Sequence, residues 1–190
     1  MLGFNEVGDA LAARIRVAKL IAIDGFPCAG KSTLADRLSE QFGLQILGFD
    51  DFYLPEPYWP ADIAPGFPFP FFRTQEFYEA VRTLKIEGRC LYHPYDWGSS
   101  HISTITHELS RNGPLIVAGC SVLDSAISQS YDLKIFVESN TATLTDARRM
   151  RDGEVDAENW QHLFLPSVDL YMRTMPQQRA DFVVAGRGIR

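Results

Sequence analysis

Short apolar segments rich in β-branched residues alternate with segments of helical periodicity along this chain of 190 residues. Lys19–Asp24 (KLIAID) and Leu44–Phe49 are two such apolar segments, and each predicts a buried strand. Between them, Lys31–Phe42 carries leucine and phenylalanine on one helical stripe, and Gly43 follows at the usual stop position. The pattern therefore predicts a strand, a loop, a helix and a second strand in this order.

The same alternation continues toward the C-terminus. Leu115–Ala118, Leu133–Val137 and Phe182–Val184 predict three more strands, with helical stretches around Leu123–Ser130 and Thr143–Asp152. Strands that alternate with helices favour an α/β fold, in which a parallel β-sheet is flanked by helices on both faces. Ligands of such folds bind at the carboxyl ends of the strands. The length suits one domain that spans residues 1–190.

Ahead of the first predicted strand, apolar residues recur at helical spacing, at Leu2, Phe4, Val7, Leu11 and Ile15. Asn5 is available as a cap near the start of this segment. We therefore expect a short amphipathic helix that packs against the edge of the sheet.

The segment from Leu54 to Arg73 interrupts the alternation. Its six prolines exclude a regular helix or a central strand, and aromatic residues lie among them. Two interpretations are open: a rigid surface loop, or an aromatic-rich cover over a substrate pocket. Long loops in compact domains tend to be functional, so we favour the cover and assign residues 54–73 to the substrate side.

The glycine-rich loop after the first strand reads GFPCAGKS and satisfies the pattern G-x-x-x-x-G-K-[ST] between a predicted strand and a predicted helix. Backbone N–H groups of such a loop point into one concavity, where the helix N-terminus also favours phosphate. The Lys31 side chain adds a positive charge, the Ser32 hydroxyl is placed to ligate Mg²⁺, and Thr33 can support the loop. A glycine turn that matches by chance is the alternative, which the flanking elements disfavour. We therefore expect ATP to bind at Gly25, Phe26, Pro27, Cys28, Ala29, Gly30, Lys31, Ser32 and Thr33.

Two carboxylates, Asp50 and Asp51, stand at the end of the second strand in the run FDDFY. We expect this strand to neighbour the phosphate loop. A carboxylate near the γ-phosphate can accept the proton of an acceptor hydroxyl and help to hold Mg²⁺. We assign the base and a metal contact to Asp50, and we expect Asp51 to cap the turn or to contact magnesium-bound water on the substrate side. The alternative is that one of the two carboxylates only caps the turn.

Composition excludes several classes of partner and compartment. The formal net charge of −6 argues against polymeric nucleic acid, whose binding depends mainly on Lys and Arg. Cys28, Cys90 and Cys120 lie far apart, which indicates neither a disulfide framework nor a zinc site. No signal-like segment or membrane-length apolar stretch is visible. We expect a cytoplasmic protein without a membrane partner, and the sequence leaves homo-oligomer formation open.

Together, IAIDGFPCAGKSTLADRL, DDFY, PYDW and ARRMRD resemble the uridine kinase and nicotinamide riboside kinase group of P-loop kinases, within the phosphoribulokinase and uridine kinase family. The resemblance spans most of the chain. It implies a P-loop NTPase fold with a small lid at about residues 147–158, and it implies that Asp50 is the base. Arg148 and Arg151 match the lid arginines that close over the transferred phosphoryl group, although a solvated helix end would also explain them.

The resemblance also implies residues on the acceptor side. Tyr95 and, displaced by one position, His101 match a tyrosine and a histidine that line the nucleobase pocket of the family. A buried tyrosine beside a surface histidine is the alternative. The tail Gln177–Gly188 resembles the closing strand, which often lies near the adenine.

The chain departs from the family pattern at three places. Ala118 replaces a glutamate that supports magnesium in relatives, so Asp50, Asp51 or Asp24 would have to compensate. Phe72 replaces an aspartate that binds the ribose hydroxyls. The lid after residue 152 is shorter and lacks further arginines.

The second departure bears on the acceptor. Without that aspartate, either Arg73 or Glu76 binds groups of the acceptor other than the ribose hydroxyls, or the acceptor is not a ribonucleoside. We therefore expect an ATP- and Mg²⁺-dependent kinase that phosphorylates a hydroxyl of a nucleoside-like or sugar-like small molecule, with Asp51, Tyr53, Arg73, Tyr95 and His101 on the acceptor side. The alternatives are a kinase of another small acceptor, such as pantothenate, glycerate or a sugar, and a nucleotide-binding protein without transfer activity.

Overall fold

A parallel five-stranded sheet forms the centre of the protein in a computed structural model that describes residues 1–140 and 157–187. The strand order is β2-β7-β1-β8-β9, and every neighbouring pair is parallel. The predicted parallel sheet is therefore confirmed, with each of its five strands present. Their bounds are β1 Leu20–Gly25, β2 Gln45–Gly48, β7 Leu115–Ala118, β8 Leu133–Glu138 and β9 Phe182–Ala185.

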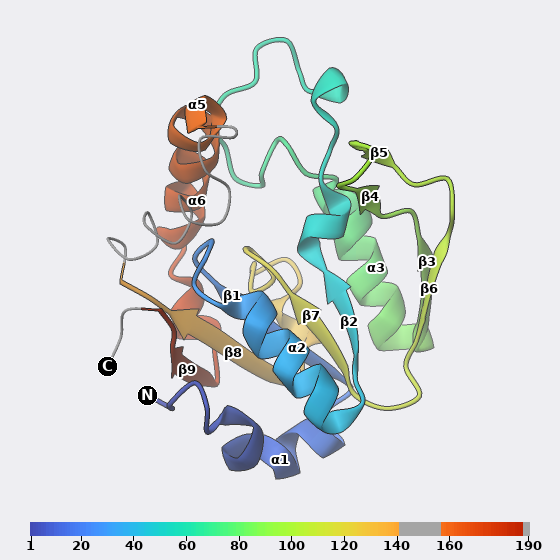
Figure 1. Ribbon diagram of the computed structural model, residues 1–190, viewed down its shortest axis with the longest axis vertical. Coiled ribbons are helices and arrows are strands. Elements are labelled where there is room, and N and C mark those ends of the chain that lie inside the picture. The colour runs from blue at the N-terminus through green and yellow to red at the C-terminus, as the bar shows by residue number, and fades with distance from the viewer. Residues whose placement is uncertain (141–156, 188–190) are drawn as a thin grey trace.

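Alternation of side chains along β1 divides the core into two layers, one on each face of the sheet. Leu20 and Ala22 belong to one buried cluster, and Ile21 and Ile23 belong to the other. Helices α1 (Val7–Val17) and α2 (Lys31–Phe42) cover the isoleucine face. Helices α3 (Thr74–Glu87) and α6 (Leu165–Met172) cover the opposite face (Figure 1). Helices on both faces explain why the strands are apolar almost throughout.

Helix α2 has the bounds that the sequence predicted. Gly30 precedes it with a φ of 106°, and Gly43 follows it with a φ of 68°. Both values favour glycine, because a side chain would strain the backbone there. The N–H of Gly43 donates to the carbonyl of Ser39, which closes the last turn.

The N-terminal segment forms the predicted helix, but its cap is different. Glu6 is the N-cap residue of α1 and makes no side-chain cap, and the Asn5 side chain instead accepts a hydrogen bond from Arg37 at 2.5 Å. The prediction that Asn5 caps the helix was wrong. Contact with the sheet edge is made by Leu2, which pairs with Val184 of β9, while α1 packs on the face that α2 also covers.

The predicted helix over 123–130 is absent. The chain turns repeatedly there, and only Ser128–Ser130 forms a short 3₁₀-helix. The Asp124 carboxylate accepts hydrogen bonds from Ser125 and from the N–H of Ala126, at 3.2 Å each. Such local bonds from an aspartate side chain compete with helix formation.

The segment from Leu54 to Arg73 forms no regular helix or strand apart from the short 3₁₀-helix Glu56–Tyr58, as predicted. In Figure 1 it arches from β2 toward α5 (Ala157–Asn159) and α6. After α3, the chain forms two small antiparallel pairs beside the main sheet. These are β3 (Arg89–Tyr92) with β6 (His107–Ser110), and β4 (Tyr95–Asp96) with β5 (His101–Ile102).

The remaining helical elements are short. They are the 3₁₀-helices Phe49–Phe52 and Pro176–Arg179 and the π-helix Trp160–Phe164, which joins α5 to α6. Among the described residues, no helix combines the length and the apolar character that crossing a bilayer requires.

Candidate active site

A cavity of about 790 Å³ opens at the carboxyl ends of β1, β2 and β7. This volume lies within the range of roughly 300–1,000 Å³ that small-molecule sites occupy. The glycine-rich loop and the start of α2 form one wall, and aromatic residues form much of the rest. Its lining is Pro27, Cys28, Gly30, Lys31, Ser32, Thr33, Ala35, Asp36, Ile46, Gly48, Phe49, Asp50, Tyr53, Phe69, Phe71, Phe72, Trp97, Ala118, Gly119, Cys120, Trp160, Phe164, Val168 and Arg187.

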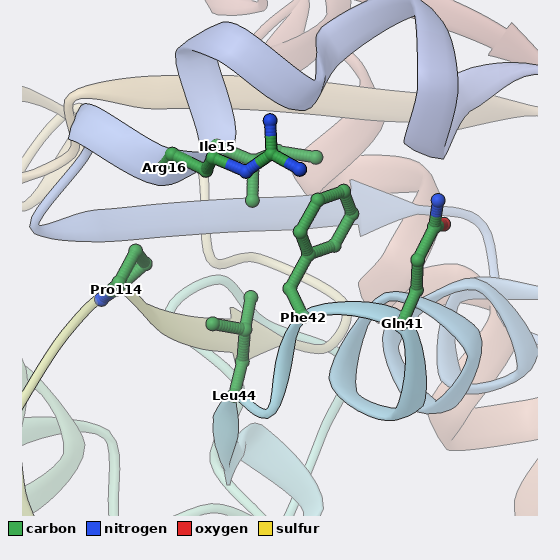
Figure 2. Close-up of a pocket in the computed structure, with 6 residues that line it drawn as sticks. All are labelled: Ile15, Arg16, Gln41, Phe42, Leu44 and Pro114. Carbon is green, nitrogen blue, oxygen red and sulfur yellow. The ribbon is translucent and has the colours of Figure 1, made fainter.

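A smaller cavity of about 280 Å³ lies away from these residues, between the last turns of α1 and α2 (Figure 2). The Arg16 guanidinium lies 5.7 Å from the centre of the Phe42 ring there. None of the predicted site residues lines this cavity.

The glycine-rich loop has a backbone that only glycine tolerates at its start. Gly25 has a φ of 151°, and a Cβ added to it would lie 2.3 Å from the carbonyl oxygen of Val137 on β8. Cys28 takes a positive φ of 63° without being glycine. The loop is therefore a tight turn pressed against the neighbouring strand, and it delivers the chain directly to the N-terminus of α2.

The N-terminus of α2 faces the cavity. Its first N–H groups have no carbonyl partner within the helix, and no acidic residue stands in its first turn. Lys31, Ser32 and Thr33 all line the cavity at this point. The Lys31 ammonium donates to the carbonyl of Phe26 at 2.8 Å, which holds its charge over the loop. Amide donors, the helix dipole and one ammonium group converge there, as phosphate binding requires.

The segment after β8 and the C-terminal tail both form hydrogen bonds with the glycine-rich loop. The carbonyl of Ala29 accepts hydrogen bonds from the Ser139 hydroxyl and from the N–H of Arg187, at 3.3 Å each. A Cβ added to Gly186 would lie 2.6 Å from that carbonyl oxygen. Arg187 itself lines the cavity. The sequence placed this tail near the adenine by resemblance only and did not single out Arg187.

Strand β2, which leads into the 3₁₀-helix that carries Asp50, does not pair directly with β1. Strand β7 lies between β1 and β2. Asp50 nevertheless reaches the cavity, because the 3₁₀-helix Phe49–Phe52 begins directly at the end of β2. Its carboxylate is exposed in the same cavity as Lys31 and Ser32.

Asp51 points elsewhere. Its carboxylate accepts a hydrogen bond from the Tyr92 hydroxyl of β3 at 2.8 Å, and it is not among the residues that line the cavity. Partial burial raises the pKa of Asp51, the bond from Tyr92 lowers it, and the neighbouring charge of Asp50 raises it further. The two adjacent carboxylates therefore have different surroundings.

Arg73 lies beneath this turn. Its guanidinium donates to the backbone carbonyls of Asp51 and His93 at 2.9 and 2.8 Å and pairs with Glu76 at 2.6 Å. Its Nε is buried without a partner among the described residues, and its side chain does not line the cavity. In this arrangement Arg73 fixes the backbone on which Asp50 and Asp51 stand.

The three ring residues predicted on the acceptor side are not equally placed. Tyr53 lines the cavity. Tyr95 lies behind it with ring centres 5.0 Å apart. His101 is exposed on β5, opposite Asp96, and its Nδ1 lies 2.6 Å from the carbonyl of Ser99. The structure therefore brings Tyr53 and Tyr95 together and leaves His101 outside the cavity lining.

Sequence reasoning missed part of the aromatic wall. Trp160 and Phe164 stand at the two ends of the π-helix and both line the cavity. A π-helix is rare and often occurs at functional sites. The spacing of four residues between two large aromatic residues is the signal that could have indicated them.

Asp24 cannot supply a metal-binding carboxylate in place of the glutamate absent at Ala118. It is fully buried and accepts hydrogen bonds from the N–H groups of Gly25, Ser121 and Leu123 and from the Tyr171 hydroxyl. Burial raises its pKa, and these bonds offset part of that rise. Its oxygens are occupied by these hydrogen bonds, which link the end of β1, the segment after β7 and α6.

The residues present fit one magnesium ion bound together with a nucleotide. No cluster of three or more metal-ligating side chains occurs among the described residues. Mg²⁺ does not need one, because it is usually held by one or two protein oxygens, by substrate phosphates and by water. Ser32 and Asp50 offer such oxygens in the cavity. Arg148 and Arg151, which the resemblance assigns to a lid, and the predicted helix at Thr143–Asp152 lie outside the described residues.

Comparison with known proteins gives matches in structure alone. No protein-family model matches the chain, and no curated protein matches it either. A Bacillus stearothermophilus protein described provisionally as a uridine kinase has a TM-score of 0.73 and 18% identity, covering 95% of this chain and 96% of its own. A Silicibacter sp. TM1040 protein described provisionally as a fructose transport system kinase has a TM-score of 0.66 and 20% identity, covering 95% and 98%.

The chain has a P-loop NTPase fold. D-glycerate 3-kinase from Cryptococcus neoformans shares it more distantly, with a TM-score of 0.52 and 14% identity over 93% of this chain and 87% of that one. These structures are kinases of one fold, so the resemblance read from the motifs is confirmed at the level of the fold.

Proposed function

We propose that the protein is an ATP-dependent kinase that transfers a phosphoryl group to a hydroxyl of a small molecule, of nucleoside-like or sugar-like character. One observation carries this proposal: Lys31, Ser32 and Asp50 line a single cavity. Phosphoryl transfer needs donors for the phosphates, a site for magnesium and a carboxylate beside the acceptor, and these three residues supply them.

The chain contributes mainly binding and positioning. The N–H groups of the loop and of the first turn of α2 bind the β-phosphate, and Lys31 binds phosphate oxygens by charge. Ser32 and Asp50 would hold the magnesium ion, which supplies charge neutralisation between the phosphates when bound. We assign Arg148 and Arg151 to closing over the γ-phosphate, as the sequence predicted.

In the transfer step, the Asp50 carboxylate accepts the proton of the acceptor hydroxyl. The freed oxygen forms a bond to the γ-phosphorus, and the bond between that phosphorus and the β–γ bridging oxygen breaks. ADP leaves with the bridging oxygen. The exposed position of Asp50 at the cavity suits this role, because a general base must reach the hydroxyl directly.

A shared fold does not select the acceptor. The similar structures are described as a uridine kinase, a kinase of a fructose transport system and a D-glycerate 3-kinase. A nucleotide-binding protein without transfer activity is the second candidate. The specific observation in its favour is Ala118, which lines the cavity without offering a carboxylate.

Release of ADP by the purified protein tests the proposal. The protein is incubated with ATP and Mg²⁺ and with uridine, nicotinamide riboside, sugars, pantothenate or glycerate in turn. Stimulation by one acceptor, abolished in Lys31→Ala, supports a kinase. ATP binding without stimulation by any acceptor supports the non-catalytic candidate instead.

A further inference from the structure

The cavity has two chemically different sides. Four ionic side chains line it among the described residues, and they are Lys31, Asp36, Asp50 and Arg187. Three of these, Lys31, Asp36 and Arg187, belong to the glycine-rich loop, to α2 or to the tail that braces the loop. The side beyond Asp50 is formed by apolar and aromatic residues, which are Tyr53, Phe69, Phe71, Phe72, Trp97, Trp160, Phe164 and Val168.

These rings are held by contacts with one another. Phe72 stacks on Phe49 with ring centres 4.2 Å apart and planes inclined by 21°. Phe71 lies 4.6 Å from Phe164. The wall is therefore built mainly from two segments far apart in sequence, the loop 54–73 with the preceding Tyr53 and the π-helix with α6, and Trp97, just after β4, adds a third part.

One hydrogen bond joins the two segments, and one more stabilises each segment internally. The hydroxyl of Ser167 on α6 accepts a hydrogen bond from the N–H of Gly66 at 3.1 Å and donates to the carbonyl of Leu163 at 2.7 Å. The indole N–H of Trp59 donates to the carbonyl of Leu54 at 2.7 Å, which fixes the loop internally. The aromatic wall is thus preformed, and a preformed wall selects ligands by shape and polarity.

Such a wall discriminates between acceptors. Among the described residues, the polar side-chain groups on this wall are the Tyr53 hydroxyl and the indole N–H groups of Trp97 and Trp160. A ligand hydroxyl or carboxylate pressed against the phenylalanine rings loses its bonds to water without gaining a partner there, which lowers affinity roughly tenfold or more per group. A flat ring gains from the same surface by apolar burial and by ring contacts. A polyol or a small acid is therefore a poor fit for this side of the cavity.

We infer that the acceptor is an alcohol carried on a flat, mainly apolar ring, with its hydroxyl directed to Asp50, rather than a polyol or an anionic acid. The inference rests on the proposed phosphoryl transfer for the role of Asp50. The geometry behind it is the single aromatic wall that Phe72, Phe164 and Trp97 share beyond that carboxylate.

Binding can be measured independently of turnover. All three tryptophans of the chain lie at this wall, since Trp97 and Trp160 line the cavity and the Trp59 ring centre is 6.2 Å from that of Phe164. With ADP and Mg²⁺ present, benzyl alcohol and pyridylmethanol should each change tryptophan fluorescence and bind at least tenfold more tightly than D-fructose or D-glycerate. Tighter binding of fructose or glycerate would overturn the inference, whatever the enzyme assay shows.

Turnover gives the second measurement. ADP release should be stimulated by the ring-bearing alcohols, and Trp97→Ala or Phe164→Leu should raise their KM about tenfold while leaving the KM for ATP unchanged. Trp97 is 61% exposed, so its removal should not unfold the protein. Ile105→Ala, at an exposed position outside the cavity lining, is the matched control and should change neither KM.

The two proposals fail in different ways. If a sugar, an acid or a polyhydroxylated ribonucleoside is phosphorylated with a higher kcat/KM than the ring-bearing alcohols, the acceptor inference is wrong and the kinase function stands. If no compound stimulates ADP release, the kinase function fails. The fluorescence titration then still decides whether the wall prefers flat rings.

Discussion

The hydroxyl of Tyr171, on α6, donates a hydrogen bond to the buried carboxylate of Asp24 at the end of β1. The same carboxylate accepts bonds from the N–H groups of Gly25, Ser121 and Leu123 at 2.6, 3.2 and 2.7 Å. One side chain thereby joins the strand before the phosphate-binding loop, the segment after β7 and the helix that carries Val168 of the cavity wall.

Tyr171→Phe should lower the free energy of unfolding by about 1–3 kcal/mol, because it removes one donor from a buried carboxylate. Urea denaturation measures this loss. Tyr131→Phe is the matched control, since the Tyr131 hydroxyl is buried and has no partner among the described residues. Its removal should be neutral or stabilising. Equal losses in both variants would contradict the assigned role of the Tyr171 hydroxyl.

Asp50→Asn should reduce kcat by roughly 10²–10⁴-fold, the usual contribution of a positioned general base. The affinity of this variant for ATP, measured without Mg²⁺, should stay near that of the wild type, because the glycine-rich loop is unchanged. Asp36→Asn provides the control, since Asp36 is an exposed carboxylate lining the same cavity from α2. Full activity in the Asp50 variant combined with loss of activity in the Asp36 variant would show that Asp50 is not the base.

The Tyr92 hydroxyl should control the titration of Asp51. Burial raises the pKa of the Asp51 carboxyl, and the hydrogen bond from Tyr92 lowers it. Tyr92→Phe removes only the lowering contribution, so the pKa should rise further. Carboxyl ¹³C shifts followed against pH measure the midpoint in both proteins. A midpoint that falls in the variant would mean that the Tyr92 hydroxyl does not stabilise the charged form.

Asp132 should make stability depend on pH in the acid range. Partial burial alone would raise its pKa, but the Lys85 ammonium at 2.6 Å and the N–H groups of Leu20 and Lys19 outweigh this and hold the pKa below its usual value. A lowered folded-state pKa stabilises the protein above the unfolded-state pKa of about 4, and this stabilisation is lost as the pH falls through the folded-state pKa.

Asp132→Asn should therefore cost about 1 kcal/mol at neutral pH, a modest figure because the pair is partly exposed and screened. The difference from the wild type should shrink below about pH 4. Thermal or urea unfolding across that range measures it. A difference that grows on acidification would contradict the assigned direction of the pKa.

The parts of the fold that local chemistry determines could be predicted from the sequence. Gly30 and Gly43 take positive φ values at the two ends of α2, so the bounds of this helix followed from residue type alone. The five strands of the main sheet were equally clear, because they are short, largely apolar segments. The short antiparallel strands β3, β4, β5 and β6 were not predicted. The strand order could not be predicted, since nothing local to Leu115–Ala118 indicates that it inserts between β1 and β2.

The candidate site also combines residues that a local motif predicts with residues that depend on long-range contacts. Lys31 and Ser32 follow from a local motif whose geometry is fixed by its own backbone. The sequence assigned the base to Asp50 and a turn cap or a contact with magnesium-bound water to Asp51. It did not predict that the Asp51 carboxylate accepts a hydrogen bond from Tyr92, forty-one positions along the chain, instead of lining the cavity. The four-residue spacing of Trp160 and Phe164 places both rings on one side of their helical segment. Phe164 packs on Phe71 of the loop 54–73, and this long-range contact, which orients the pair at the cavity, is not encoded by the spacing.

Binding of ATP and Mg²⁺ at the glycine-rich loop can be measured by calorimetric titration. We expect saturable heat with one nucleotide per chain in the wild type. Lys31→Ala should lose that heat, because it removes the ammonium held over the loop at 2.8 Å from the Phe26 carbonyl. Absence of binding in the wild type, or unchanged binding in the Lys31 variant, would contradict binding at this loop.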